Sequence, residues 1–86
     1  MKVVYSKDFL KQASKLPNKL QQALDDILNI LRRDPFYPTL HTKHLKGELR
    51  SMLSFRITRE WRVIFMFAAE DTIRLLKIGN RKDIYK

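Results

Sequence analysis

The chain contains no cysteine, only two glycines and no long apolar run. Without cysteine it can form neither a disulfide scaffold nor a thiolate zinc site. No stretch approaches the roughly 18 apolar residues that a membrane-spanning helix needs, and residues 1–5 lack the apolar core of a signal peptide. We therefore expect a cytoplasmic protein with no membrane segment. The scarcity of glycine also excludes a Gly-rich phosphate-binding loop.

Acidic residues are scarce as well: 18 Lys and Arg against 9 Asp and Glu give a formal net charge of +9 over 86 residues. Such an excess is typical of a nucleic-acid binder and also attracts acidic protein partners; a merely solvated basic surface is the alternative. Residues 41–86 hold 11 of the basic residues and 5 of the acidic ones. This half is rich in arginine, whose planar fork binds phosphate, so we place an RNA surface there.

The length predicts one domain over residues 1–86, and the hydrophobic periodicity predicts the element order β-α-α-β-β-β. We expect strands at 2–5, 53–58, 61–67 and 72–78, helices at 7–15 and 18–33, an irregular segment at 35–50 and a tail at 80–86. Ser6 and Asn18 are of the residue types that cap helices, and Pro17 separates the two helices.

This order predicts an α+β domain of two layers, in which a helical hairpin packs on one face of a mainly antiparallel, four-stranded sheet. The other face stays open and carries Arg at alternate strand positions. A domain of this size buries a modest core, so we expect any functional site to be a shallow groove on that face.

Standard catalytic sets are missing, and a group of cations with an acid and a phenol remains. His41 and His44 have the spacing of a metal-ligand pair, but they lie in a Pro-flanked loop beside lysines, so we expect no metal and no cofactor. We assign catalysis to Arg56, Glu60, Arg62, Arg81 and Tyr85, and RNA binding to His44, Lys46, Arg50, Arg59, Trp61 and Lys82.

Such a set suits the cleavage of RNA, which carries its own nucleophile, the 2′-OH, beside the scissile phosphate. The enzyme must remove that proton, hold negative charge on the phosphoryl oxygens and protonate the leaving 5′-oxygen. Fixed cations supply the electrostatic part without a metal. We expect Arg56 and Arg81 to clamp the phosphate, Tyr85 to act as an acid or base or to stack on a nucleobase, and Glu60 to act as a base.

Several of these residues also allow a plainer structural interpretation. Arg62 alternates within an apolar strand and can be a structural arginine, and Trp61 can belong to the core. Glu60 can be a turn residue, Tyr85 can lie on a frayed end, and His44 can hydrogen bond within its loop.

The motifs resemble those of the RelE/ParE toxin superfamily over nearly the whole chain. They are Leu45-Lys46-Gly47, Ser54-Phe55-Arg56-Ile57, Trp61-Arg62-Val63-Ile64-Phe65 and Ile78-Gly79-Asn80-Arg81-Lys82-Asp83-Ile84-Tyr85. The resemblance implies the RelE-like microbial RNase fold and the toxin of a type II toxin–antitoxin system. RelE-like members are mRNA interferases, ribosome-dependent endoribonucleases that inhibit translation, whereas ParE-like members inhibit DNA gyrase. The implied partners are an acidic cognate antitoxin, with which the toxin forms an oligomer, and the ribosome with its mRNA.

The resemblance also implies catalytic positions at Arg56, at Arg62 or its neighbours Glu60 and Trp61, at Arg81 and at Tyr85. At Arg56 and Arg81 the chain follows RelE-like members, because YafQ-like members use histidines there. Ser54 stands near the position of a second RelE-like lysine, and His44 is one position from a YafQ-type loop histidine. ParE-like members generally lack the C-terminal pair of Arg81 and Tyr85, so the resemblance favours the nuclease, with gyrase inhibition as the alternative.

Overall fold

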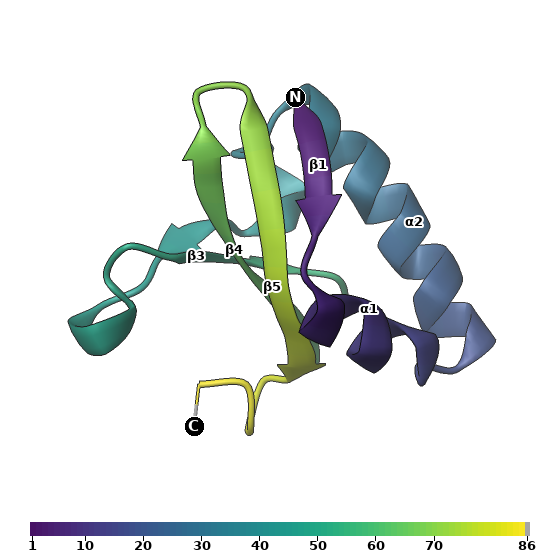
Figure 1. Ribbon diagram of the computed structural model, residues 1–86. Coiled ribbons are helices and arrows are strands. Elements are labelled where there is room, and N and C mark those ends of the chain that lie inside the picture. The colour runs from purple at the N-terminus through teal and green to yellow at the C-terminus, as the bar shows by residue number, and fades with distance from the viewer. Residues whose placement is uncertain (86) are drawn as a thin grey trace.

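The computed structural model describes residues 1–85 and consists of a sheet with two α-helices covering one of its faces (Figure 1). The elements are β1 (Lys2–Tyr5), α1 (Lys7–Ser14), α2 (Asn18–Arg33), β2 (Lys43–His44), β3 (Leu53–Arg56), β4 (Trp61–Ala69) and β5 (Thr72–Asn80), with 3₁₀ turns at Pro38–Leu40 and Gly47–Leu49. The strand order is β1-β5-β4-β3-β2, and all neighbours are antiparallel except β1 and β5. The predicted α+β two-layer architecture is confirmed. Neither α-helix is long and apolar enough to cross a membrane.

The predicted number of strands is wrong by one, because the sheet has five strands rather than four. The additional strand, β2, lies in the segment that we expected to be irregular. It pairs with the edge of β3, with Lys43 opposite Ser54 and His44 opposite Leu53. A two-residue strand is too short for a periodic pattern, so only the pairing partner reveals it.

The two helices begin in different ways. Ser6 caps α1 as expected: its Oγ accepts the Phe9 N–H at 3.0 Å and donates to the Leu76 carbonyl at 2.9 Å. Asn18 does not cap α2, because the cap residue is Pro17, which makes no side-chain cap bond. The helix thus starts at Asn18 itself, one residue earlier than a cap at that position implies.

The core lies between the helices and one face of the sheet. Its largest fully buried members are Phe9, Leu31, Leu40, Phe55, Val63, Phe65, Ile73 and Leu75. The strand members of this set fall on alternate positions of β3, β4 and β5, and so on one face of the sheet. The arginines that alternate with them are therefore directed to the other face.

A bulge in β5 alters this alternation near the site. Ile64 pairs with Lys77, whereas the next residue, Phe65, pairs with Leu75, so Leu76 is an additional residue without its own partner on β4. As a result, Leu76 and Lys77 line the same hollow on the open side of the sheet. The strands β4 and β5 also run further than predicted, to Ala69 and Asn80, because the hairpin pairs along its whole length.

Candidate active site

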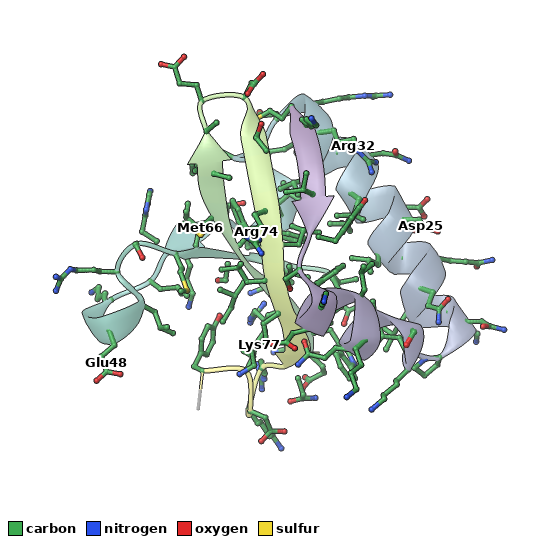
Figure 2. The ribbon with its side chains drawn as sticks, in the orientation of Figure 1. Asp25, Arg32, Glu48, Met66, Arg74 and Lys77 are labelled. Atoms are coloured by element: carbon green, nitrogen blue, oxygen red, sulfur yellow. The ribbon has the colours of Figure 1, made fainter. Side chains whose placement is uncertain are left out.

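The sheet face that turns away from the helices carries basic and apolar side chains. Figure 2 shows Met66, Arg74 and Lys77 along β4 and β5 at this face. Two rows of side chains, each made of residues paired across neighbouring strands, lie on this face. The C-terminal tail folds against them. These rows and the tail make up the candidate site.

The first row places two arginines side by side. Arg56 of β3 pairs with Arg62 of β4, which pairs in turn with Gly79 of β5. Residues directly opposite each other in a sheet have Cβ atoms about 4.5–5.5 Å apart, and like charges there destabilise the sheet. Within residues 1–85 neither arginine forms an ion pair with a carboxylate, and the buried Nε of Arg56 has no hydrogen-bond partner. Two adjacent guanidinium groups with no counter-ion among the described residues are chemically suited to bind an anion.

The second row, one step further along the strands, consists of Lys43, Ser54, Ile64 and Lys77. Ser54 is only 1% exposed, and its Oγ accepts a hydrogen bond from Tyr85 Oη at 3.1 Å. The Nζ atom of Lys43 lies 5.7 Å from the centroid of the Tyr85 ring. Ser54 and Arg56 are two residues apart and so share a face of β3, which places the phenol beside the arginine pair.

A short turn in the tail explains how Tyr85 reaches this face. Asn80 Oδ1 accepts the Lys82 N–H at 3.0 Å, and the Asn80 carbonyl accepts the Ile84 N–H at 3.0 Å. Ile84 is 2% exposed and packs against Gly79, where an added Cβ would lie 3.5 Å from the Ile84 Cβ. The tail is therefore anchored on both sides of the turn, and Tyr85 does not lie on a frayed end.

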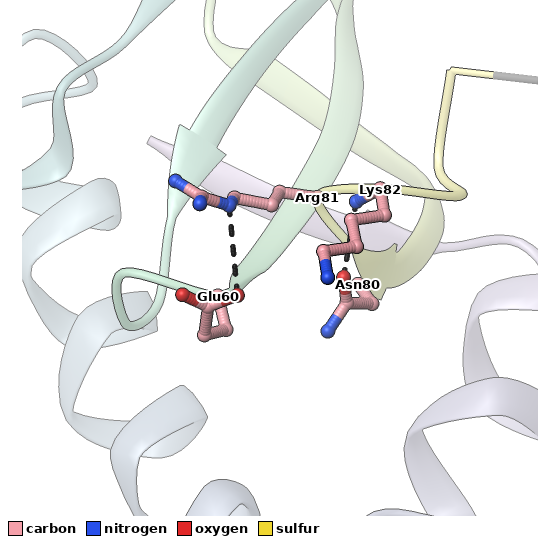
Figure 3. Close-up of polar contacts among 4 residues, drawn as sticks. All are labelled: Glu60, Asn80, Arg81 and Lys82. Atoms are coloured by element: carbon pink, nitrogen blue, oxygen red, sulfur yellow. Dashed lines mark hydrogen bonds and ion pairs between the residues drawn. The ribbon is translucent and has the colours of Figure 1, made fainter.

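Glu60 and Arg81 lie together where the β3–β4 turn contacts the tail. The Arg81 N–H donates to the Glu60 carbonyl at 2.8 Å, and Arg81 Nε lies 3.5 Å from Glu60 Oε2 (Figure 3). The two side chains are 44% and 48% exposed. A solvent-exposed ion pair of this kind contributes about 0–1 kcal/mol to the stability of the fold. The pair therefore orients Arg81, and a substrate phosphate can still bind its guanidinium group.

Four of the residues assigned to RNA binding are exposed cations near these rows. Lys46 and Arg50 flank the 3₁₀ turn Gly47–Leu49, Arg59 lies in the β3–β4 turn, and Lys82 lies in the tail turn. None of the four belongs to the paired rows.

The structure does not bring Trp61 or His44 to the open face. Trp61 is half-buried and packs against the helix-side core, which agrees with the plainer interpretation of this residue. His44 pairs with the core residue Leu53, and its ring stacks on Phe36 with centroids 6.3 Å apart. Both side chains thus lie on the helix side, because residues paired across two strands share a face.

Two shallow hollows meet at Tyr85. The first, of about 390 Å³, is lined by Lys43, Leu45, Lys46, Glu48, Leu49 and Tyr85. The second, of about 350 Å³, is lined by Glu48, Leu49, Met52, Ile64, Leu76, Lys77, Ile84 and Tyr85. Lys43 and Lys77 were missing from the sequence-based assignment. Lys43 lies in a strand too short to recognise, and the face of Lys77 depends on the bulge at Leu76.

The site offers cations and a phenol. Among residues 1–85 there is no group of three or more His, Cys, Asp and Glu side chains that could hold a metal ion. Adjacent guanidinium groups bind phosphate oxygens in a bidentate manner, and a phenol transfers a proton or stacks on a base. The arrangement is therefore chemically suited to gripping a phosphodiester next to a proton donor.

No family model matches the chain, and no curated protein sequence matches it. Solved structures do match its fold. The YoeB/ParE toxin from Agrobacterium tumefaciens is 19% identical over 94% of this chain and 99% of its own, with a TM-score of 0.80. The toxin–antitoxin complex RelBE2 from Mycobacterium tuberculosis is 23% identical over 93% of this chain and 96% of that one, with a TM-score of 0.78. The archaeal RelE–RelB complex from Pyrococcus horikoshii is 22% identical, over 95% of this chain and 96% of that one, and its TM-score is also 0.78.

The chain has the fold of the RelE/ParE toxins. The expected RelE-like architecture is thereby confirmed, and the matches span nearly the whole length of this chain and of the matched chains. In this RelE/ParE fold the helical hairpin covers one sheet face, and the C-terminal turn brings Tyr85 to the other. At these identities the likeness is one of fold.

Proposed function

We propose that this protein is the toxin of a type II toxin–antitoxin pair and a metal-independent endoribonuclease that cleaves mRNA on the ribosome. One observation carries the proposal: the arginine pair Arg56 and Arg62 has no carboxylate counter-ion within residues 1–85, and Tyr85 is hydrogen bonded to Ser54 beside it. The RelE/ParE fold supports the same conclusion.

In the proposed reaction the RNA 2′-oxygen attacks the adjacent phosphorus, and the bond from phosphorus to the 5′-oxygen breaks. The products are a 2′,3′-cyclic phosphate and a 5′-OH end. Arg56 and Arg62 hold the non-bridging oxygens, and such fixed donors are often the largest contribution to catalysis. Glu60 takes the 2′-OH proton, Arg81 beside it donates to the phosphate in the transition state, and Tyr85 protonates the leaving oxygen.

The proposed partners follow from charge and fold. A protein with a net charge of +9 attracts an acidic chain as well as RNA. Several of the matched structures are toxin–antitoxin complexes, which supports an acidic antitoxin that covers the open face and forms an oligomer with the toxin. The ribosome and its mRNA are the proposed targets, and they place the protein in the cytoplasm.

The test is a cleavage assay with purified protein and translating ribosomes. Primer extension should locate cuts in the mRNA at the ribosomal A site, and the fragments should carry cyclic-phosphate ends. Arg56→Ala and Arg81→Ala should each slow cleavage about 100- to 1,000-fold, the usual effect of removing one transition-state donor. Lys19→Ala, which removes an equal charge from an exposed site on α2, should cleave at the wild-type rate.

Intact mRNA under these conditions would refute the proposal. Trapped gyrase–DNA cleavage complexes with unaffected translation would identify a gyrase inhibitor instead. Harmless expression without any antitoxin would indicate a toxin fold that has no activity.

A further inference from the structure

The edge strand β2 brings one more cation to the site. Lys43 pairs with Ser54, so its side chain lies on the open face, and its Nζ lies 5.7 Å from the centroid of the Tyr85 ring. Ser54 accepts the hydrogen bond of Tyr85. Lys43 therefore flanks the phenol from one strand while Ser54 holds it from the next.

We propose that Lys43 contacts an RNA phosphate in the hollow that it lines with Tyr85, and that it is a further catalytic residue of this protein. The proposal rests on the proposed function. It assigns a task to a residue that no motif of the sequence marks, and it extends the phosphate-binding surface from β3 and β4 to β2.

On β3 the position beside Tyr85 is held by the uncharged Ser54, so the cation next to the phenol comes from the neighbouring strand β2. Ser54 and Arg56 share a face of β3, so a cation at position 54 would extend the arginine pair along the strand. The serine is uncharged, 1% exposed, and its hydroxyl is taken by Tyr85. Lys43 lies directly opposite, with Cβ atoms about 4.5–5.5 Å apart in such pairs, and is the nearest cation by register on the β2 side.

The contact between Lys43 and Tyr85 leaves the ammonium group available. A cation within about 6 Å of a ring centroid gains about 0.5–1 kcal/mol at an exposed site, and Lys43 is exposed. A phosphate that enters the hollow can therefore take the ammonium group without breaking a strong internal bond. Lysine binds phosphate as a mobile point charge, which suits a position at the rim.

The hollow is large enough to take a phosphate group beside Tyr85. Its volume of about 390 Å³ lies within the range of about 300–1,000 Å³ for small-ligand sites. Leu45 and Leu49 supply apolar wall, and Lys43 and Lys46 supply charge. Glu48, the one carboxylate among the described lining residues, lies on the outer tip of its loop and points away from the sheet (Figure 2). We therefore expect the phosphate on the Lys43 side, next to Tyr85.

The test compares Lys43→Ala with two matched variants. Lys19→Ala removes the same charge from an exposed position on α2, and Lys43→Arg keeps the charge in place. Cleavage of mRNA on translating ribosomes should slow about 10- to 100-fold in Lys43→Ala, the worth of one charge-assisted hydrogen bond. Lys43→Arg should restore most of the lost rate, because it keeps the charge in place, and Lys19→Ala should stay within about twofold of wild type. Thermal unfolding of each variant shows that it is folded.

A second measurement separates phosphate contact from support of Tyr85. The probe is a single-stranded RNA oligonucleotide with 2′-deoxy sugars, which the protein cannot cleave, titrated at several salt concentrations. Loss of one phosphate contact should reduce the slope of log K against log salt by about 0.7–1. Lys43→Ala should show this reduction, and Lys19→Ala should not.

Equal rates and equal salt slopes for Lys43→Ala and Lys19→Ala would overturn the assignment of Lys43 and leave the proposed function intact. A wild-type protein that cleaves no mRNA would refute the proposed function and, with it, a catalytic role of Lys43. The salt slopes would still decide whether Lys43 contacts the RNA backbone.

Discussion

Replacing Arg56 by Met should make the protein more stable and inactive at the same time. Arg56 lies opposite Arg62, and its buried Nε has no hydrogen-bond partner within residues 1–85. Both features cost folding free energy that only a bound anion would recover. Methionine keeps an unbranched apolar stem of similar reach and removes both the charge and the unsatisfied donor.

The magnitude follows from these two contributions. A buried donor without an acceptor costs about 1–3 kcal/mol, and like charges directly opposite in a sheet cost about 0.2–1 kcal/mol. Allowing for imperfect packing of the new side chain, the free energy of unfolding should rise by about 1–2 kcal/mol. For a domain of this size, that raises the Tm by about 5–15 °C.

Calorimetry and urea denaturation measure this change, and Arg74→Met is the matched control. Arg74 lies on the same face, but it is exposed and has no arginine opposite, so its replacement should change the Tm by less than about 3 °C. Sulfate at ten times its Kd should stabilise the wild type by about 1.4 kcal/mol and should have little effect on Arg56→Met. A lower Tm for Arg56→Met, or equal stabilisation of both proteins by sulfate, would refute the anion site.

Three further changes test the tail, the first helix and the loop. Tyr85→Phe removes the hydrogen bond to Ser54 and should slow mRNA cleavage about 10²–10⁴-fold if the phenol is the general acid; an unchanged rate would leave only a stacking role. Ser6→Ala removes the helix cap and the bond to the Leu76 carbonyl, and urea denaturation should show a loss of about 1–3 kcal/mol with cleavage unchanged. Gly47 has a φ of +66° in open space, so Gly47→Ala should cost about 1–2 kcal/mol of backbone strain alone, and a smaller loss would contradict this account.

The strong periodic patterns located the long elements. The apolar stripe between Pro17 and Pro35 predicted the bounds of α2 correctly, and the polar–apolar alternation located β4 and β5. Helices and long strands repeat the same local rule over many residues, so their signal accumulates along the chain. The two-residue strand β2 has no such repeat. It forms because it pairs with the edge of β3, and the sequence around Lys43 does not indicate that pairing.

The sequence predicted part of the candidate site, again where residues alternate regularly along a strand. Arg56 and Arg62 were found because they alternate with core residues, and the structure pairs them across β3 and β4. Trp61 was assigned to RNA binding, yet its side chain packs on the helix side. Side chains alternate between the two faces along a strand, and Trp61 is two residues from the buried Val63, so its place on the helix side follows from the pattern.

Composition and periodicity by themselves determined that this protein is a basic, two-layer α+β domain with arginines on one sheet face, because charge and apolar spacing are properties of the chain. The meeting of Lys43, Ser54 and Tyr85 was decided only by the tertiary structure. These residues are far apart in the sequence. Their proximity depends on the pairing of an edge strand and on a tail turn that packs Ile84 over Gly79, and such contacts form only once the sheet exists.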